Sequence, residues 1–440
     1  MNSLNMRKDT IRPMRPFICL SCLSGKLAPI IIMSLIASLY GCASMKISRE
    51  EYRPIAQYSV AKGDDIIGRP AYVTLEQGDT LPDIARHFDL GINAVSQANP
   101  GIDIWVPQAG ERIMLPLSFI LPDSPRRGIV INLATMRLFQ FKGDGNSVTV
   151  LTHPVGVGTE ERPSPTGQMF VDRKAVRPTW HVPASIANDH LKKGDPLPAS
   201  VPPGPDNPLG EYAMYLSKQG YLIHGTNKPA SIGFRATNGC IRLYPEDIKK
   251  VFETTPVGTP VRMVNQPYLI GRSEGMIYLE VHAPPENIDT PEFDRMYAKL
   301  KNIEKESGRA IDWSKVKKAL AEARGIPVPI SGQVKEHRIV EPVQFRHPDE
   351  LYGRPRVPEL KKDAWSVMAA DFTDETDAVR LSSMINHQGP QIPARVLPKN
   401  GRFRVIAGPF RDAREAKEAL KRLKIDLEID GALIEPVRQR

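Results

Sequence analysis

One histidine and one cysteine, each next to a glycine, form the part of this sequence best suited to chemistry. Residues 221–242 contain His224 at the end of an apolar run and Cys240 in the stretch Thr-Asn-Gly-Cys-Ile-Arg. A free cysteine is mostly protonated at neutral pH, and a neighbouring imidazole can take its proton and leave a nucleophilic thiolate. The two residue types at this spacing therefore predict thiol chemistry.

The residues around this pair fit the same chemistry. Gly239 leaves the backbone unhindered beside the sulfur, so the amides of Gly239 and Cys240 could face a developing oxyanion. Arg242 leaves an extended strand on the same side as Cys240. The carbonyl of Gly225 could accept the proton on the far ring nitrogen of His224 and fix its tautomer. The alternative is a small buried cysteine and a core histidine without catalytic roles.

The spacing resembles the motif of the L,D-transpeptidase family with a YkuD-type catalytic domain: His-Gly-Thr, then Ser/Thr-x-Gly-Cys-Ile/Val-Arg. The resemblance implies that Cys240 is the nucleophile, His224 the general base and acid, Gly225 its orienting carbonyl and Arg242 a supporting site residue. Many members of the family carry histidine before the Gly-Cys pair, where this chain has Asn238. That departure concerns a secondary contact with the substrate.

The surrounding residues 126–266 are expected to position the pair. Short apolar runs bounded by turn residues predict strands at 129–133, 137–141 and 148–151, and a further strand at 257–264. The resemblance implies a mostly-β, YkuD-like sandwich or barrel. A proline-rich stretch over 177–210 is typical of a lid or binding wall. We expect substrate-binding residues on or beside it: Trp180, His181, Tyr215 and Asn238.

Composition and charge limit the possible partners. The chain has 440 residues, 41 of them proline, and a net charge of +9. The first 42 residues hold five basic side chains and one acidic one, which account for +4 and leave +5 for the rest. No basic stripe with interleaved aromatic residues favours nucleic acid.

The first 42 residues predict an export leader. Basic residues precede a short apolar run at 27–40, followed by Gly41 and Cys42. This ending resembles a bacterial lipoprotein cleavage site, which implies lipidation of Cys42, a membrane anchor, and a periplasmic protein held at the outer membrane. An uncleaved signal anchor is the alternative. Cys19 and Cys22 lie inside the leader, so Cys240 would be the free thiol of the mature chain.

Two further modules are indicated at the ends of the mature chain. After a polar tether at 43–69, residues 70–117 predict a β-α-α-β unit that resembles a LysM module, which binds cell-wall glycan. Residues 364–437 predict the order β-α-β-β-α-β and resemble a SPOR domain, which binds glycan strands without peptide stems. An unrelated ferredoxin-like module is the alternative. Between them we expect a helical extension at 267–330 and a linker at 331–363.

These resemblances together imply a peptidoglycan L,D-transpeptidase in a multi-domain chain. The thiolate would attack the amide before the terminal D-alanine of a tetrapeptide stem, and an amine would then take the acyl group. The acceptor could be another stem, giving a 3→3 cross-link, or a lysine of an envelope lipoprotein. The alternatives are an L,D-carboxypeptidase, with water as acceptor, and a wall-binding scaffold without activity. The sequence indicates no metal, nucleotide or other cofactor.

Overall fold

The computed structural model of this chain describes residues 57–61, 63–144, 147–282, 290–331 and 342–437. The expected leader at 1–42, with Cys42, and the first part of the tether lie outside the described residues. Within the described parts of the chain, none of the helices combines the length and apolarity needed to cross a membrane.

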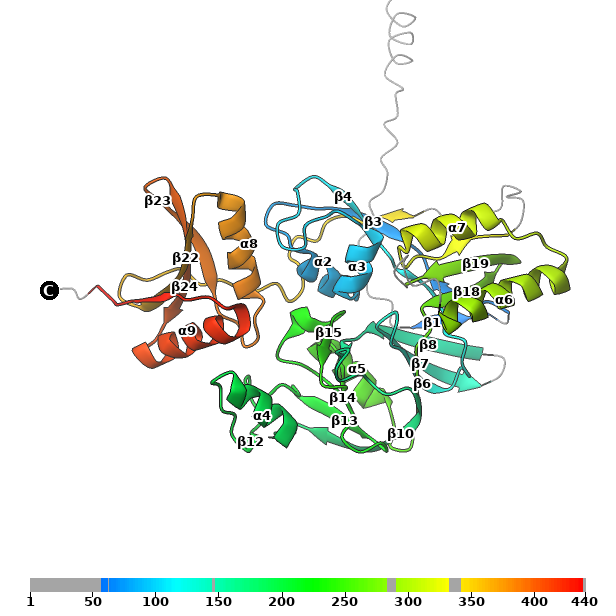
Figure 1. The fold of residues 1–440 in the computed structure, drawn as a ribbon, viewed down its shortest axis with the longest axis horizontal. Helices are drawn as coiled ribbons and strands as arrows, with labels where there is room; N and C mark the ends of the chain where they lie inside the picture. The colour runs from blue at the N-terminus through cyan, green and yellow to red at the C-terminus, as the bar shows by residue number, and fades with distance from the viewer. Residues whose placement is uncertain (1–56, 62, 145–146, 283–289, 332–341, 438–440) are drawn as a thin grey trace, which may run out of the picture. The chain divides into compact units, whose positions relative to one another are not determined.

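A nine-stranded sheet forms the central domain (Figure 1). The expected strands at 129–133, 137–141, 148–151 and 257–264 are all present, some of them longer than predicted. In sheet order the strands are β1 (Tyr58–Val60), β8 (Ser147–Pro154), β7 (Arg137–Asp144), β6 (Gly128–Asn132), β17 (Pro260–Val264), β10 (Gly167–Val176), β13 (Tyr212–Leu216), β14 (Leu222–His224) and β16 (Ile241–Arg242).

Strand β10 joins the two halves of this sheet. It pairs with β17 through Gly167–Phe170 and with β13 from Val171 onwards, and its register shifts between Val171 and Arg173. Such an irregularity bends and twists a strand. Buried side chains from both halves consequently meet in one core, which includes Ile129, Ile131, Leu138, Val171, Met214, Ile223, Ile241, Val261 and Met263.

Helix α5 (Pro245–Thr254) follows β16 directly and packs against β13. Its first turn contains proline together with Glu246 and Asp247, residues that favour the start of a helix. Smaller elements complete the domain: β9 (Val157–Gly158), β11 (Trp180–His181), α4 (Ala184–Lys192), β12 (Ser200–Val201), η1 (Pro229–Ser231) and β15 (Arg235–Thr237).

The N-terminal module, residues 70–117, has the expected β-α-α-β order. Its elements are β3 (Ala71–Thr74), α2 (Leu81–His87), α3 (Ile92–Ala98) and β4 (Arg112–Leu115), with β3 and β4 antiparallel. Thr80 caps α2, because its Oγ1 accepts a hydrogen bond from the amide of Asp83. Leu81, Ile84 and Phe88 are fully buried beneath the sheet.

The expected tether is partly ordered. Two short strands lie in its last part: β1 pairs with β8, and β2 (Ile66–Gly68) pairs with β5 (Ser118–Ile120). A strand of three residues owes its conformation to the strand it pairs with. The local sequence therefore does not predict β1 and β2.

The extension after the central domain contains a hairpin and two helices. β18 (Tyr268–Ser273) and β19 (Met276–Val281) pair, and β20 (Val328–Pro329) adds to β19. The predicted helical stretch divides into α6 (Pro291–Ser307) and α7 (Trp313–Glu322). Gly308 ends α6 in the left-handed conformation, a frequent terminator of helices.

Part of the expected linker also forms regular secondary structure. Residues 332–341 lie outside the described part, but β21 (Val343–Gln344) pairs in parallel with β3. The ring of Phe345 stacks on that of Phe88. The second half of the linker therefore packs on the N-terminal module.

Residues 365–434 have the order β-α-β-β-α-β, as expected. The sheet order is β23-β24-β22-β25, and α8 and α9 both contact it (Figure 1). The elements are β22 (Trp365–Phe372), α8 (Glu375–Asn386), β23 (Ala394–Lys399), β24 (Arg402–Phe410), α9 (Ala413–Leu427) and β25 (Ala432–Ile434).

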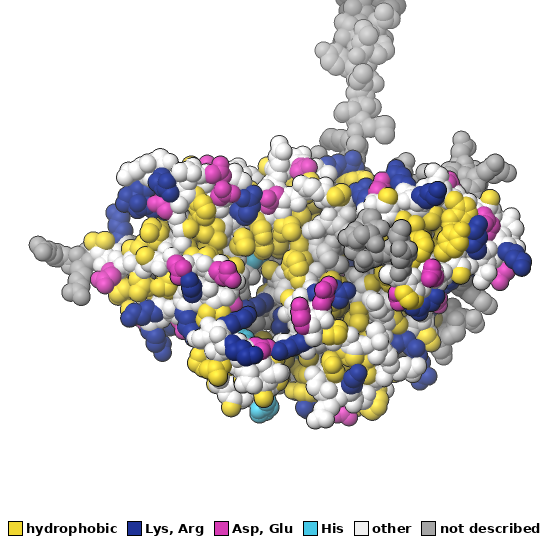
Figure 2. All heavy atoms as spheres, viewed as in Figure 1, with side chains coloured by type: hydrophobic (Ala, Val, Ile, Leu, Met, Phe, Trp, Pro, Cys, Tyr) yellow, Lys and Arg dark blue, Asp and Glu magenta, His cyan; other side chains and the backbone are white. Residues whose placement is uncertain are grey.

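Acidic and basic side chains alternate over the face of the molecule shown in Figure 2. No continuous basic stripe crosses this face. This distribution agrees with the small charge excess that the sequence carries outside its first 42 residues.

Candidate active site

A tight turn between β15 and β16 presents Cys240. The hydroxyl of Thr237 accepts a hydrogen bond from the amide of Gly239 (3.1 Å) and donates one to the carbonyl of Cys240 (2.7 Å). Gly239 has φ +102°, and a Cβ at this position would lie 2.8 Å from Cε1 of Tyr221. Only glycine fits this backbone without strain, which explains the Gly-Cys pair.

The sulfur of Cys240 is partly exposed and rests as a thiol. Its Sγ donates to the carbonyl of Gly220 at 3.7 Å. Burial raises the pKa of Cys240, while the amide of Leu222 and the charge of Arg242 act in the opposite direction. The thiol must therefore lose its proton to a base before it can act as a nucleophile.

His224 is buried in the form of a neutral base. Its Nδ1 lies 2.6 Å from the carbonyl of Gly225 and must donate to it, since a carbonyl only accepts. Burial, and after it the charge of Arg242, lowers the pKa of His224 to about 3, although the carbonyls of Gly225 and Leu209 favour the charged ring. The proton on Nδ1 leaves Nε2 with a free lone pair at neutral pH.

The parallel pairing of β14 with β16 brings the two functional segments together. Ile223 pairs with Ile241, and His224 pairs with Arg242. Paired residues of neighbouring strands share a face, so His224 and Arg242 project from the same side, and Cys240 directly precedes β16. Among the hydrogen bonds of the described residues, none joins Sγ to the imidazole. Each group bonds to a backbone carbonyl instead.

Arg242 acts on both groups through its charge. It lowers the pKa of Cys240 and that of His224, and burial lowers its own pKa. Its Nη1 reaches the carbonyl of Ala236 at 3.5 Å, and its buried Nε has no partner among the described atoms.

The expected substrate-binding residues divide into two groups. Asn238 is exposed next to Cys240 and accepts a hydrogen bond from Nη1 of Arg162 at 2.6 Å. Tyr215 pairs with Leu222 in the sheet, and the guanidinium of Arg173 lies 3.4 Å from the centre of its ring. Asn238 thus lies in the turn that carries Cys240, whereas Tyr215 lies on β13, which β14 separates from β16.

Trp180 and His181 lie on β11, which pairs with β12 in the proline-rich segment. Trp180 is half-buried and His181 exposed. Within the described residues, no hydrogen bond, ion pair or ring contact joins either side chain to Cys240 or His224.

Three functional positions escaped the sequence analysis. Thr237 shapes the turn that carries the thiol. Arg162 bonds Asn238 and also forms an ion pair with Asp189 of α4, so it connects the turn to the wall. A threonine two residues before the Gly-Cys pair is the one local signal that would have pointed to this turn.

The third position, Asn207, organises the proline-rich wall. It is fully buried, and its Nδ2 donates to the carbonyl of Pro178 at 2.8 Å. Its Oδ1 accepts from the amide of Leu209 at 2.9 Å. A Cβ on Gly210, the next residue, would lie 2.9 Å from the amide of Thr226, so this wall packs directly against the His-Gly-Thr segment.

A buried neutral imidazole, a partly exposed thiol on a tight turn and an arginine whose charge acts on both therefore lie on neighbouring segments of the sheet. Residues 126–263 match the L,D-transpeptidase catalytic domain family (YkuD), and residues 361–435 match the SPOR domain family.

Relatives that match part of the chain agree with the catalytic-domain match. The chain is 38% identical over 280 residues to the "Probable L,D-transpeptidase ErfK/SrfK" of Salmonella typhimurium, covering 61% of this chain and 89% of that protein. It is 40% identical over 226 residues to the "Probable L,D-transpeptidase YbiS" of Escherichia coli, covering 50% and 73%. This chain therefore belongs to the L,D-transpeptidase family of enzymes and carries a C-terminal SPOR domain.

Among solved structures, the chain is similar to the catalytic domain of an L,D-transpeptidase from E. faecium, determined by NMR. The identity is 24% and the TM-score 0.25, and the match covers 32% of this chain and 100% of that one.

Proposed function

We propose that the chain forms a thioester through Cys240 and transfers the acyl group between peptidoglycan stems. The donor is a tetrapeptide stem, and the bond that breaks is the amide before its terminal D-alanine. The observation that carries this proposal is the fixed tautomer of His224, which leaves Nε2 unprotonated on the strand that pairs with the segment directly after Cys240.

In the first half-reaction, Nε2 of His224 takes the proton of the thiol, and the sulfur attacks the donor carbonyl. The amide of Gly239 is already bonded to Thr237, so we assign the oxyanion to the amide of Cys240 alone. The imidazolium then returns its proton to the departing amine of D-alanine, and a thioester remains.

The second half-reaction reverses these proton movements. An acceptor amine approaches the thioester, His224 removes a proton from it, and the thiol leaves with that proton. An amine of a second stem gives a 3→3 cross-link, and a lysine of an envelope lipoprotein gives an anchored protein. The exposed Asn238 and Arg162 border the thiol and are our candidates for holding the stems.

The flanking modules support a wall polymer as substrate. We assign glycan binding to the N-terminal module, as a LysM unit, and binding of stem-free glycan to the SPOR domain. The leader and Cys42 support a periplasmic, lipid-anchored protein at the outer membrane. These assignments rest on residue patterns and on the β-α-α-β order of the N-terminal module.

Incubating the purified chain with tetrapeptide-containing muropeptides tests the proposal. Cross-linked dimers and free D-alanine are the expected products, and mass spectrometry should show an acyl group on Cys240. Tripeptide monomers alone would mean that water is the acceptor and that the protein is an L,D-carboxypeptidase. A wild-type chain that never becomes acylated would instead support the wall-binding scaffold.

A further inference from the structure

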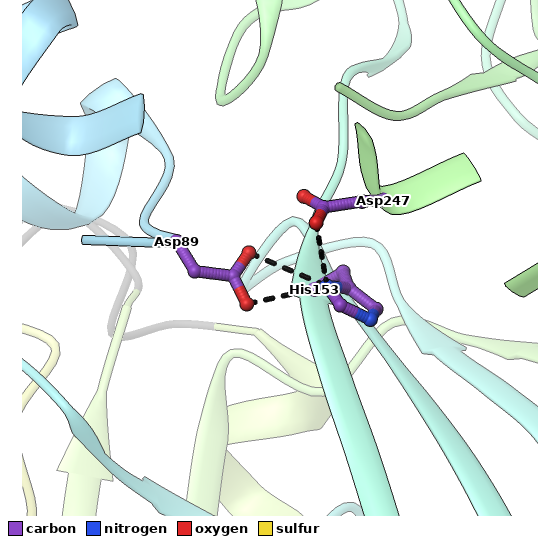
Figure 3. A group of neighbouring side chains, drawn as sticks. All are labelled: Asp89, His153 and Asp247. Carbon is purple, nitrogen blue, oxygen red and sulfur yellow. Dashed lines mark hydrogen bonds and ion pairs between the residues drawn. The ribbon is translucent and has the colours of Figure 1, made fainter. Parts of the chain in front are cut away.

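Three ionisable side chains meet at the junction between the N-terminal module and the central domain (Figure 3). Asp89 follows α2, His153 lies on β8 and Asp247 lies in the first turn of α5. The side chains of His153 and Asp247 are 5% and 4% exposed and that of Asp89 is 25% exposed. None of the three takes part in the proposed acyl transfer.

The distances within this cluster fit a shared cation better than a single hydrogen bond. Nδ1 of His153 lies 3.2 Å from Oδ2 and 3.3 Å from Oδ1 of Asp89, and 3.2 Å from Oδ1 of Asp247. One N–H cannot donate fully to two carboxylates, and charge-assisted bonds are usually about 2.7–2.9 Å long.

A tetrahedral metal ion would account for the same separations. Zinc bonds to nitrogen and oxygen of about 2.0–2.2 Å place neighbouring ligand atoms about 3.3–3.5 Å apart. One candidate ligand atom from each of the three residues lies within 4.8 Å of the others. Nδ1 of His153, one oxygen of Asp89 and one oxygen of Asp247 would supply three of the four donors of such an ion, and a water molecule would supply the fourth.

The charges around the cluster also favour a cation. Ligand oxygens of Asp89 and Asp247 lie within 4.8 Å of each other, and two carboxylates this close repel unless a positive charge lies beside them. Lys250 approaches Asp247 at 3.5 Å but is half exposed, and Arg137 donates to the backbone carbonyl of Asp89. Two carboxylates and an imidazole are a ligand set that first-row divalent metals accept.

We propose that Asp89, His153 and Asp247 bind a divalent transition-metal ion, with Zn²⁺ as its representative. The ion would fasten the N-terminal module to the central domain. Other contacts at this junction already hold the two together. Tyr244 donates from its hydroxyl to the carbonyl of Leu90 (3.1 Å), and the amide of Ile92 donates to the carbonyl of Ile232 (3.3 Å). The bound metal would have a structural role, separate from the thiol chemistry.

Calorimetric titration of the chelator-treated full chain with Zn²⁺ tests this assignment. We expect one ion per chain, and Co²⁺ should give the visible absorption of a four-coordinate site without a thiolate band. Because Cys240 could itself capture Zn²⁺, the titration is repeated on Cys240→Ala, which should bind the ion equally well. Absence of stoichiometric binding, or its loss in Cys240→Ala, would overturn the proposal.

Ligand variants locate the ion. Asp247→Asn and Asp89→Asn should each weaken Zn²⁺ binding at least about 100-fold. His282→Gln is the matched control, because His282 is another buried histidine bonded to a carboxylate, at 2.6 Å from Glu280. Circular dichroism identifies any variant that fails to fold. In the wild-type chain, Zn²⁺ should also protect the amides after α2 from hydrogen exchange, and unchanged exchange would contradict the assignment.

Discussion

His224 and His153 are buried to nearly the same extent, at 3% and 4% exposure, but their surroundings shift their pKa values in opposite directions. Burial and the charge of Arg242 lower the pKa of His224 to about 3. Burial acts on His153 in the same sense, but Asp247 and Asp89 outweigh it and raise its pKa to about 10. The sign of the nearest charge decides which buried histidine is a neutral base and which is protonated at neutral pH.

The two regions also differ in what positions the ring. Backbone carbonyls surround His224, and its strand partner is fixed by sheet register. Side-chain carboxylates from two other elements hold His153. Positioning by the backbone suits a histidine that must gain and lose a proton in every turnover. Positioning by carboxylates suits a histidine whose ring must stay bound to its neighbours.

Replacing the nucleophile should have the largest effect. Cys240→Ala removes the atom that forms the thioester, so transpeptidation should fall by about 10³-fold or more. Mass spectrometry after incubation with muropeptides should find no acylated chain. Residual transfer at the wild-type rate would show that the reacting group lies elsewhere.

Removing the base compares the two kinds of buried histidine directly. His224→Gln should lower the acylation rate by roughly 10²–10⁴-fold, the usual contribution of general base catalysis. His282→Gln, which changes a buried histidine paired with Glu280, should leave the rate per folded molecule within about twofold of wild type. Equal losses in both variants would assign His224 a structural role.

The pH dependence of thiol alkylation tests the resting state of the pair. Because the pKa of Cys240 is raised and that of His224 is lowered to about 3, both groups are neutral at pH 7. The rate of Cys240 alkylation should therefore rise with pH up to tenfold per unit above neutrality, following the thiolate fraction. A rate that stays constant from pH 6 to 8 would instead reveal a preformed thiolate–imidazolium pair.

The neighbouring strands that carry His224 and follow Cys240 could be predicted from sequence, because their signals are local. Glycines next to His224 and Cys240 mark turns, and apolar runs mark the strands that end there. Gly239 shows what the sequence could not predict. Its amide was expected to face the oxyanion, but it donates a hydrogen bond to the hydroxyl of Thr237. A hydrogen bond between a side chain and a backbone two residues away does not follow from residue type alone.

The junction could not be predicted, because its members are distant in sequence. Asp89 and His153 are 64 residues apart, and neither has a neighbour at metal-ligand spacing. The short strands β1, β2 and β21 were missed for the same reason, since they are ordered by partners in other segments. By contrast, the element order of residues 365–434 was predicted, because long periodic segments carry their own signal.

The backbone of the catalytic turn gives a smaller but measurable effect. Gly239→Ala places a Cβ at φ +102° and 2.8 Å from Tyr221, so it should cost about 1–3 kcal/mol and slow acylation roughly tenfold. Gly258→Ala is the control, since Gly258 has φ +85° but no atom within 4 Å of the added carbon. It should be destabilising without slowing acylation of the folded protein. If both variants slowed acylation equally, the cause would be backbone strain in general and not the contact between the new Cβ and Tyr221.

The smallest expected effect concerns the junction. Arg86 on α2 makes two bonds of 3.0 Å to Glu246 of α5, and its guanidinium lies 5.7 Å from the ring centre of Tyr244. Because both partners of the ion pair are largely buried, Arg86→Met should lower the free energy of unfolding by about 1–2 kcal/mol in urea titrations. Arg177→Met, which removes an exposed pair at 3.6 Å, should change it by less than about 0.5 kcal/mol.

Neither substitution should alter the rate at which Cys240 is alkylated, because the charges next to the thiol and to His224 are unchanged. A junction variant that slows alkylation would show that the N-terminal module controls the turn carrying Cys240. The most direct route for such control is Ile92, whose amide bonds the carbonyl of Ile232 in the loop between the catalytic histidine and cysteine. The junction and the region around Cys240 would then be coupled through that hydrogen bond.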